Sequence, residues 1–175
     1  ILSVDCTSPE GAAAAATLWQ TLAAQGAVPL GTQAWDYLRV LQGRPAPDQE
    51  LTEAYNPLEA GLWHTISFDK GCYIGQEVIA RLNTYKGVRQ RLWGLKLTTA
   101  AVEPNTPIIL EGNKIGTITS LQPTATGAIG LGYIRTRAGG PGLVAEVAGQ
   151  SVEVTALDYA QHPEVEAQPA EDQAD

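Results

Sequence analysis

The 175-residue sequence contains no methionine and only two cysteines, and both scarcities limit what it can be. Without a methionine it does not begin at an initiator, so we expect a processed or truncated piece of a longer protein. Cys6 and Cys72 form no C-x-x-C pair, and His64 and His162 are not spaced as metal ligands. A self-contained zinc or iron–sulfur site is therefore not expected. So few cysteines also fit a reducing compartment.

Long apolar runs are missing as well. No stretch reaches the length of a membrane span, and the first residues, ILSVDCTSPE, lack the basic start and apolar core of a signal peptide. The composition is 44% hydrophobic and 17% charged, which is ordinary for a soluble globular protein and not typical of a nucleic-acid binder. We predict neither a membrane nor a nucleic acid as partner.

Charge is distributed unevenly along the chain. Of its 19 acids, five lie in residues 160–175, which contain no Lys or Arg, so the other 14 face 11 bases. This segment has two prolines and few large apolar residues, and it is predicted to be a disordered acidic tail. A basic stretch is the candidate for binding an anionic ligand, although Arg89 and Arg91 also suit a solvated strand edge. Its members lie within 27 residues that hold a single acid, Glu77: Lys70, Arg81, Lys86, Arg89, Arg91 and Lys96.

Two helices are predicted near the N-terminus. Ser8 can cap the first, Pro9 suits its first position, and Gly26 can end it. Ala15, Leu18, Trp19 and Leu22 recur on one face of that helix. Thr32 can cap a second helix, which carries Trp35, Leu38 and Leu41, and the proline-containing segment 42–50 is predicted to be a loop.

The segment around Cys72 is predicted to be a strand, a turn and a helix. Asn56-Pro57 indicates a short helix start, and Thr65–Phe68 (TISF) is typical of a strand. A turn at 69–71 and a helix from about Gly75 follow. This order places Cys72 near a helix N-terminus, where free backbone N–H groups and a positive dipole end are available.

From Arg89 onward the pattern is typical of short β-strands. In RLWGLKL, Trp93, Leu95 and Leu97 fall on one face, and 106–121 and 143–157 each suggest a hairpin, with a further strand at 127–136. Five or so strands at close spacing favour a small antiparallel barrel or sandwich. We predict an α+β chain with three parts: an α/β piece over 1–88, a β-barrel over 89–159 and the tail over 160–175.

Cys72 has two interpretations that the residues leave open. Free cysteine is usually a small buried hydrophobe. However, Gly71 and Gly75 bracket Cys72, and Lys70 together with a helix terminus would favour the thiolate, the form that acts as a nucleophile. Gln76 and Glu77 suit either a ligand site or the first turn of the helix.

The motif KGCYIGQE, residues 70–77, resembles the signature of the YgfZ branch of the GcvT-type folate-binding superfamily. PLEAGL at 57–62, LRVLQGRP at 38–45, IGTITS at 115–120 and AIGLGYIR at 128–135 are similar to other parts of that family. The amino-acid sequence of residues 56–77 is most similar to cyanobacterial and plastid members of the family. The resemblance therefore covers the chain to about residue 158. It implies the C-terminal part of a folate-binding domain followed by a β-barrel.

This resemblance implies a tetrahydrofolate-dependent factor for the maturation or repair of iron–sulfur enzymes, in bacterial cytoplasm or plastid stroma. Its partners would be folate and iron–sulfur client enzymes or assembly proteins. Cys72 and Lys70 would be the functional pair. Trp63 and Trp93 are candidates to stack on a ring of the folate. The full set of expected folate contacts is Lys70, Gly71, Tyr73, Gly75, Gln76, Glu77, Arg81 and Trp63.

Two departures from the superfamily bear on the activity. The glycine-cleavage aminomethyltransferases carry a pterin-binding Glu where this sequence has Leu41, and they require no cysteine in the motif. An N-terminal lobe of the family is also missing from this sequence. A non-catalytic maturation factor is thus favoured over the alternative, a folate-dependent aminomethyltransferase, and a scaffold without ligand is a third hypothesis.

Overall fold

The computed structural model describes residues 7–84, 87–160 and 162. The chain divides into two compact units, Ile1–Trp35 and Asp36–Asp175. The helices and strands are α1 (Pro9–Ala24), α2 (Thr32–Leu41), η1 (Trp63–Thr65), α3 (Gln76–Thr84), β1 (Gln90–Leu97), β2 (Pro107–Leu110), β3 (Asn113–Thr124), β4 (Gly127–Arg135), η2 (Thr136–Ala138), β5 (Val144–Val147) and β6 (Gln150–Thr155).

The first unit contains α1, which begins and ends where the sequence predicts. The Ser8 hydroxyl accepts a hydrogen bond from the Gly11 N–H at 3.1 Å, and Pro9 occupies the first helical position. Gly26, with φ at +87°, stops the helix. The predicted apolar face is not buried, however, since Trp19 is largely exposed and α1 has no buried residue. Cys6 lies outside the described residues.

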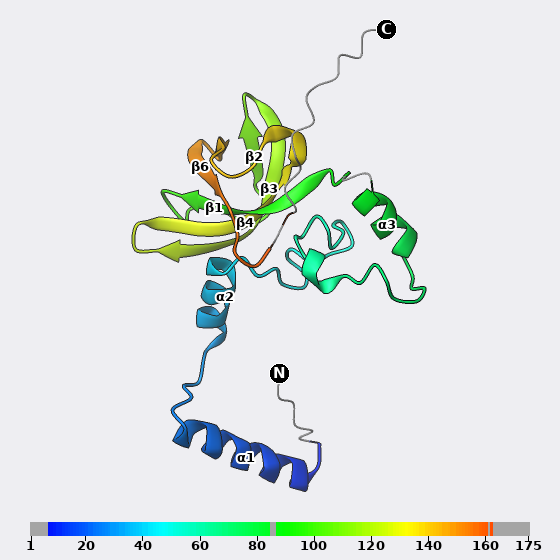
Figure 1. Cartoon of the computed structure of the whole chain (residues 1–175). Helices are drawn as coiled ribbons and strands as arrows, with labels where there is room; N and C mark the ends of the chain where they lie inside the picture. The colour runs from blue at the N-terminus through cyan, green and yellow to red at the C-terminus, as the bar shows by residue number, and fades with distance from the viewer. Residues whose placement is uncertain (1–6, 85–86, 161, 163–175) are drawn as a thin grey trace. The chain divides into compact units, whose positions relative to one another are not determined.

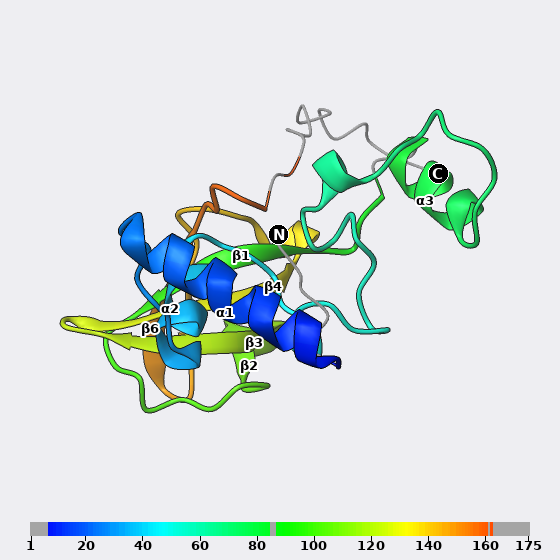
Figure 2. The same cartoon turned by 90° about the horizontal axis from the view of Figure 1, so that it is seen from below.

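The second unit is built on a closed barrel of six antiparallel strands, which confirms the predicted fold class (Figure 1). The order around the barrel is β1-β4-β3-β2-β5-β6, and β1 closes it by pairing with β6. Both predicted hairpins form. Their two-residue turns, Glu111-Gly112 and Ala148-Gly149, have positive φ at both positions, as the twist of a tight hairpin requires. Figure 2 shows the long β3–β4 hairpin extending beyond the other strands.

The barrel interior is filled by one side of each strand. On β1, Leu95 and Leu97 are buried there and Trp93 packs against them, which confirms the predicted alternation. Ile118 from β3 and Val152 from β6 are fully buried in the same cluster. Strand alternation thus places the apolar residues inside, where burial contributes about 25 cal/mol per Å² of apolar surface removed from water.

A second apolar layer lies between the barrel and the preceding segment. It contains Val40 from α2, Leu131 and Tyr133 from β4, and Ala160 after the last strand. The Tyr55 ring stacks on the Tyr133 ring with 3.6 Å between centroids. This packing fixes 36–62 against the outside of β4.

The buried side of α2 differs from the apolar side that the sequence suggests. Leu38 and Leu41 are exposed, whereas Arg39 and Val40 are buried. Arg39 is buried because its guanidinium is fully engaged. It donates to Glu50 at 3.0 Å, to Ser120 at 2.9 Å, to Asp36 at 3.2 Å and to Gln49.

Glu50 is completely buried and is the centre of this polar cluster. Its carboxylate accepts hydrogen bonds from Arg39, from the Ala46 N–H at 3.0 Å, and from Thr119 and Ser120, both at 2.6 Å. A buried ion pair is tolerated when such hydrogen bonds compensate for the lost hydration. The loop that contains Glu50, predicted at 42–50, is therefore tied to β3 at its far end.

Two local predictions are wrong. Residues 65–68 form no strand: Trp63–Thr65 is a short 3-10 helix, in which the Thr65 hydroxyl donates to the Leu62 carbonyl at 2.7 Å. Asn56 does cap the backbone, since its side chain accepts from the Leu58 and Glu59 N–H groups, both at 3.0 Å. Only turns follow it, however, because Gly61 adopts a positive φ of +74° where a helix would continue.

Candidate functional site

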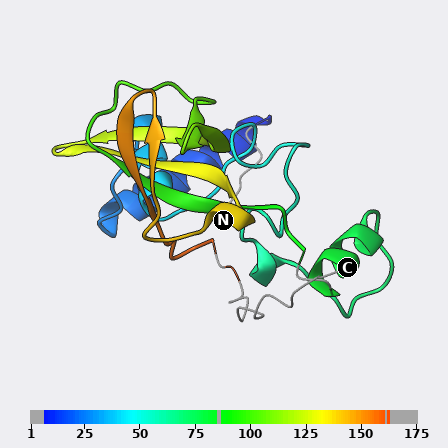
Figure 3. The ribbon, with the colours of Figure 1, turned by 90° about the horizontal axis from the view of Figure 1, so that it is seen from above.

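The KGCYIGQE motif forms a loop that leads into α3. Figure 3 shows this loop and α3 at the side of the barrel where β1 begins. The Gln76 side chain accepts a hydrogen bond from the Tyr73 N–H at 3.1 Å, so this residue stabilises the first turn. Gly75 has φ of +87°, which disfavours other residues there. Ile79 anchors the helix by packing with Leu58 and Val88.

Cys72 is exposed and is a free thiol. The structure therefore excludes the interpretation of Cys72 as a small buried hydrophobe. Lys70 is also exposed, and its ammonium lies 4.7 Å from the centroid of the Tyr73 ring. Gly71 and Glu77 are exposed as well. The motif thus presents a thiol and a cation on one loop.

Trp63 lies among core residues. It is half-buried and packs against Leu58, Ile79 and Val88, and its indole N–H is buried without a partner in the described part of the chain. A packing role accounts for its ring. The unpaired donor is the feature that a ligand acceptor would satisfy.

The predicted basic stretch separates into groups. Arg81 and Arg89 line one pocket of about 510 Å³ together with Leu82 and Gly87. Lys96 is exposed on β1, and Lys86 lies outside the described residues. Among the described members of the predicted anion-binding set, Arg81 and Arg89 thus line the same pocket.

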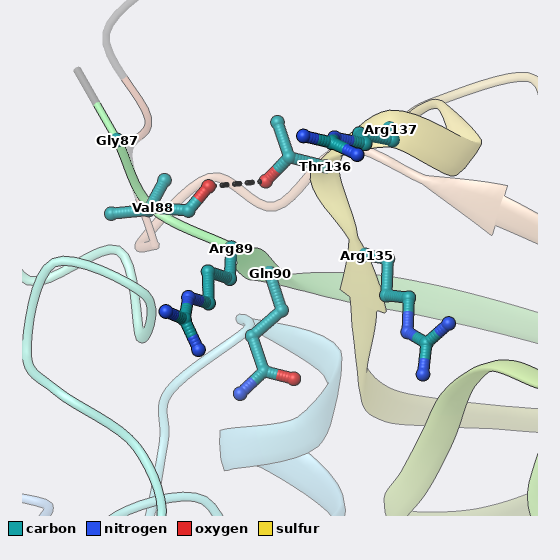
Figure 4. Close-up of a pocket in the computed structure, with 7 residues that line it drawn as sticks. All are labelled: Gly87, Val88, Arg89, Gln90, Arg135, Thr136 and Arg137. Carbon is teal, nitrogen blue, oxygen red and sulfur yellow. Dashed lines mark hydrogen bonds between the residues drawn. The ribbon is translucent and has the colours of Figure 1, made fainter. Parts of the chain in front are cut away.

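A larger pocket of about 690 Å³ adjoins the start of β1. Arg89 and Gln90 line it from one side, and Arg135 and Arg137 from the other (Figure 4). The Thr136 hydroxyl donates to the Val88 carbonyl at 2.8 Å and joins the two segments. Arg135 and Arg137 are not among the site residues that the sequence predicts. The only signal for them was the Arg-Thr-Arg run directly after an apolar strand.

Arg91, Trp93 and His162 form a separate half-buried group. The His162 ring lies 4.8 Å from the Trp93 ring, and its Nε2 is 3.0 Å from the Leu92 carbonyl oxygen. Burial, with the nearby Arg91 charge as a smaller cause, lowers the pKa of His162 to about 4 although the Leu92 carbonyl opposes this. Burial also lowers the pKa of Arg91. The ring of Trp93 therefore contacts His162. A folate ring was the stacking partner considered from the sequence.

Neither a metal centre nor a membrane span is found within the described ranges. These residues contain no group of three or more His, Cys, Asp or Glu side chains placed to hold a metal ion. None of the helices they form has the length and apolar character to cross a bilayer.

Comparison with known proteins identifies the family that the barrel resembles. Residues 90–161 match the family model of the glycine cleavage T-protein C-terminal barrel domain. A solved structure of glycine cleavage system aminomethyltransferase T from Bartonella henselae has a similar fold, with a TM-score of 0.70. It covers 87% of this chain and 45% of its own chain at 22% identity, a level that shows a shared fold alone.

Relatives similar in sequence extend beyond the barrel. A chloroplastic protein of Arabidopsis thaliana is 52% identical over 133 residues, 75% of this chain and 30% of its own, and its name is that of a transferase without a stated substrate. An aminomethyltransferase of Synechocystis is 36% identical over 140 residues, 77% of this chain and 37% of its own. The chain thus spans about a third of the length of these curated relatives.

Proposed function

We propose, from the premise that residues 90–161 are a barrel domain of the glycine cleavage T-protein type, that the chain belongs to a tetrahydrofolate-dependent factor. This factor supports the maturation or repair of iron–sulfur enzymes, and Cys72 is its reactive group. The observation that carries the proposal is the position of Cys72: an exposed free thiol within the motif KGCYIGQE, on a loop where a partner protein has access to it.

The neighbours of Cys72 have separate roles in this proposal. Gln76 and Gly75 shape the turn, and they hold the loop in place ahead of α3. Lys70 supplies a positive charge two residues from the thiol in sequence. Tyr73 positions the Lys70 ammonium over its ring. Replacing either Lys70 or Cys72 should therefore impair the activity.

The residues present fit part of a folate. The pocket that Arg81 and Arg89 line offers two guanidinium groups, which pair well with glutamate carboxylates. The Trp63 N–H is a buried donor without a partner among the described residues, as a ligand contact would require. Bound tetrahydrofolate would supply a carrier for one-carbon units. The residues of this chain would bind and orient it: Lys70, Gly71, Tyr73, Gly75, Gln76, Glu77, Arg81 and Trp63.

The aminomethyltransferase alternative is favoured by the names of several relatives, including the Synechocystis protein. Leu41 counts against it, since a leucine cannot supply the carboxylate that holds the pterin in those enzymes. Leu41 is also exposed on the last turn of α2. The chloroplastic relative favours the plastid stroma over bacterial cytoplasm as the compartment.

The test is complementation with Cys72→Ala in the complete protein. A cell that lacks its own family member receives wild type, Cys72→Ala or the matched control Cys6→Ala, and a [4Fe–4S] enzyme is assayed. We expect wild type and the control to restore that enzyme and Cys72→Ala to fail at equal protein level. Full restoration by Cys72→Ala would refute the role of the thiol.

A folate titration separates the proposal from its alternatives. We expect the purified complete protein to bind tetrahydrofolate, and Arg81→Gln to weaken binding by roughly tenfold because one charge-assisted contact is lost. Turnover of an aminomethyl donor that is insensitive to Cys72→Ala would establish the transferase instead. A flat titration would indicate a scaffold.

A further inference from the structure

The pocket that Figure 4 shows gathers three arginines from two distant parts of the sequence. Arg89 precedes β1, Arg135 ends β4, and Arg137 lies in η2. Arg135 pairs in register with Gln90, so antiparallel strand pairing brings the two segments together. The pocket is thus a consequence of the fold and is not a run of neighbouring basic residues.

Among the described residues, none that lines this pocket is acidic, and none is acidic in the adjoining pocket that Arg81 and Arg89 share. Within the described ranges the only ion pairs are those that Arg39 makes with Asp36 and Glu50. The arginines of the two pockets therefore have no carboxylate partner there. Like charges held near one another repel, and an anion between them would replace repulsion by attraction.

The arginine side chains are exposed and reach the pocket in different directions. Arg89 and Arg135 extend to the same side, with Gln90 between them, while Arg137 extends past Thr136 (Figure 4). A guanidinium presents a planar fork of donors that matches the oxygens of phosphate or carboxylate. The cavity, about 690 Å³, has the size of a small-molecule site.

We propose that the pocket lined by Arg89, Arg135 and Arg137 binds a small-molecule polyvalent oxyanion with two or more negative charges. Three cations exceed what a single carboxylate neutralises, so a monovalent anion is a poor match. Phosphoryl and carboxylate groups share the required chemistry. The site lies apart from the Cys72 loop in sequence, but it shares Arg89 with the pocket proposed for the folate carboxylates, so the variants that test it leave Arg89 unchanged.

Calorimetric titration of the complete protein, without folate, tests this inference. Diphosphate represents the phosphoryl source, citrate the carboxylate source, and acetate a monovalent control. We expect sub-millimolar binding of diphosphate or citrate, with the tighter of the two identifying the source, and none of acetate. Raising the salt concentration should weaken binding, because these exposed charges are screened.

Two variants and one matched control assign the binding to the pocket. Arg135→Gln and Arg137→Gln should each weaken it by roughly tenfold, since each removes a charge-assisted contact. Lys114→Gln removes one positive charge from an exposed position on β3 and should leave affinity unchanged. The inference is overturned if neither polyvalent anion binds at millimolar concentration, or if all three variants lose affinity equally. Folate binding is scored separately, so either proposal can fail without the other.

Discussion

The barrel and the Cys72 loop are close in sequence but hold their side chains in different ways. In the barrel, every strand pairs on both sides and contributes residues to one apolar cluster. Around Cys72, the contacts within the loop include a side-chain and a backbone hydrogen bond between Gln76 and Tyr73 and the Lys70–Tyr73 ring contact. Large apolar residues beside it, Ile74 and Val78, face solvent. The barrel is a stable support, and the loop leaves its functional groups accessible.

The same substitution made in both regions should give the largest difference. Ile118 is fully buried inside the barrel, so Ile118→Ala should lower the free energy of unfolding by about 2–5 kcal/mol through lost burial and a cavity. Ile74 is fully exposed, and Ile74→Ala should leave stability unchanged. Urea unfolding of both variants measures this. Comparable losses would show that the loop is packed in solution.

Lowering the pH should reduce the free energy of unfolding by a smaller amount, through the protonation of His162. The pKa of His162 is about 4 in the folded protein and near 6.5 when unfolded, so the unfolded state binds a proton first. Stability is therefore full above about pH 6.5 and falls as the pH decreases toward 4. We expect a loss of about 2 kcal/mol, reduced from the full shift because the ring is partly solvated.

His162→Gln provides the control for that titration, because the carboxylates still titrate in it while the imidazole is gone. The difference between the two pH profiles isolates His162, whose ring contacts Trp93. Superimposed profiles would mean that His162 is solvated.

The smallest effect is expected within the motif. Gln76→Ala removes the acceptor for the Tyr73 N–H and should cost about 1 kcal/mol, a typical value for a capping interaction. Gln76→Glu keeps an acceptor and should restore most of it. Thermal unfolding measures both. If Gln76→Ala is neutral in stability yet abolishes folate binding, Gln76 acts as the proposed ligand contact and does not stabilise the turn.

The sequence predicts the barrel well because its signals are local. Alternation in β1 and positive-φ turns such as Glu111-Gly112 depend on neighbours a few residues away. Sequence patterns do not predict side-chain positions that depend on contacts with residues far away in the chain. Arg39 is buried only because Glu50 and Ser120 surround it, and no helix pattern reveals that. Arg135 joins the anion pocket for the same reason, through the pairing of β4 with β1.

The buried pair of Arg39 and Glu50 also has a consequence for the order of folding. During synthesis both residues emerge from the ribosome long before their partners on β3, since Ser120 follows Arg39 by 81 residues and Thr119 follows Glu50 by 69. Contacts this far apart in sequence form late, because a long loop must close first. The 42–50 loop must therefore wait until β3 has been translated. A nascent chain that stalls before β3 would keep the Arg39–Glu50 pair but would lack the Thr119 and Ser120 hydroxyls that complete it.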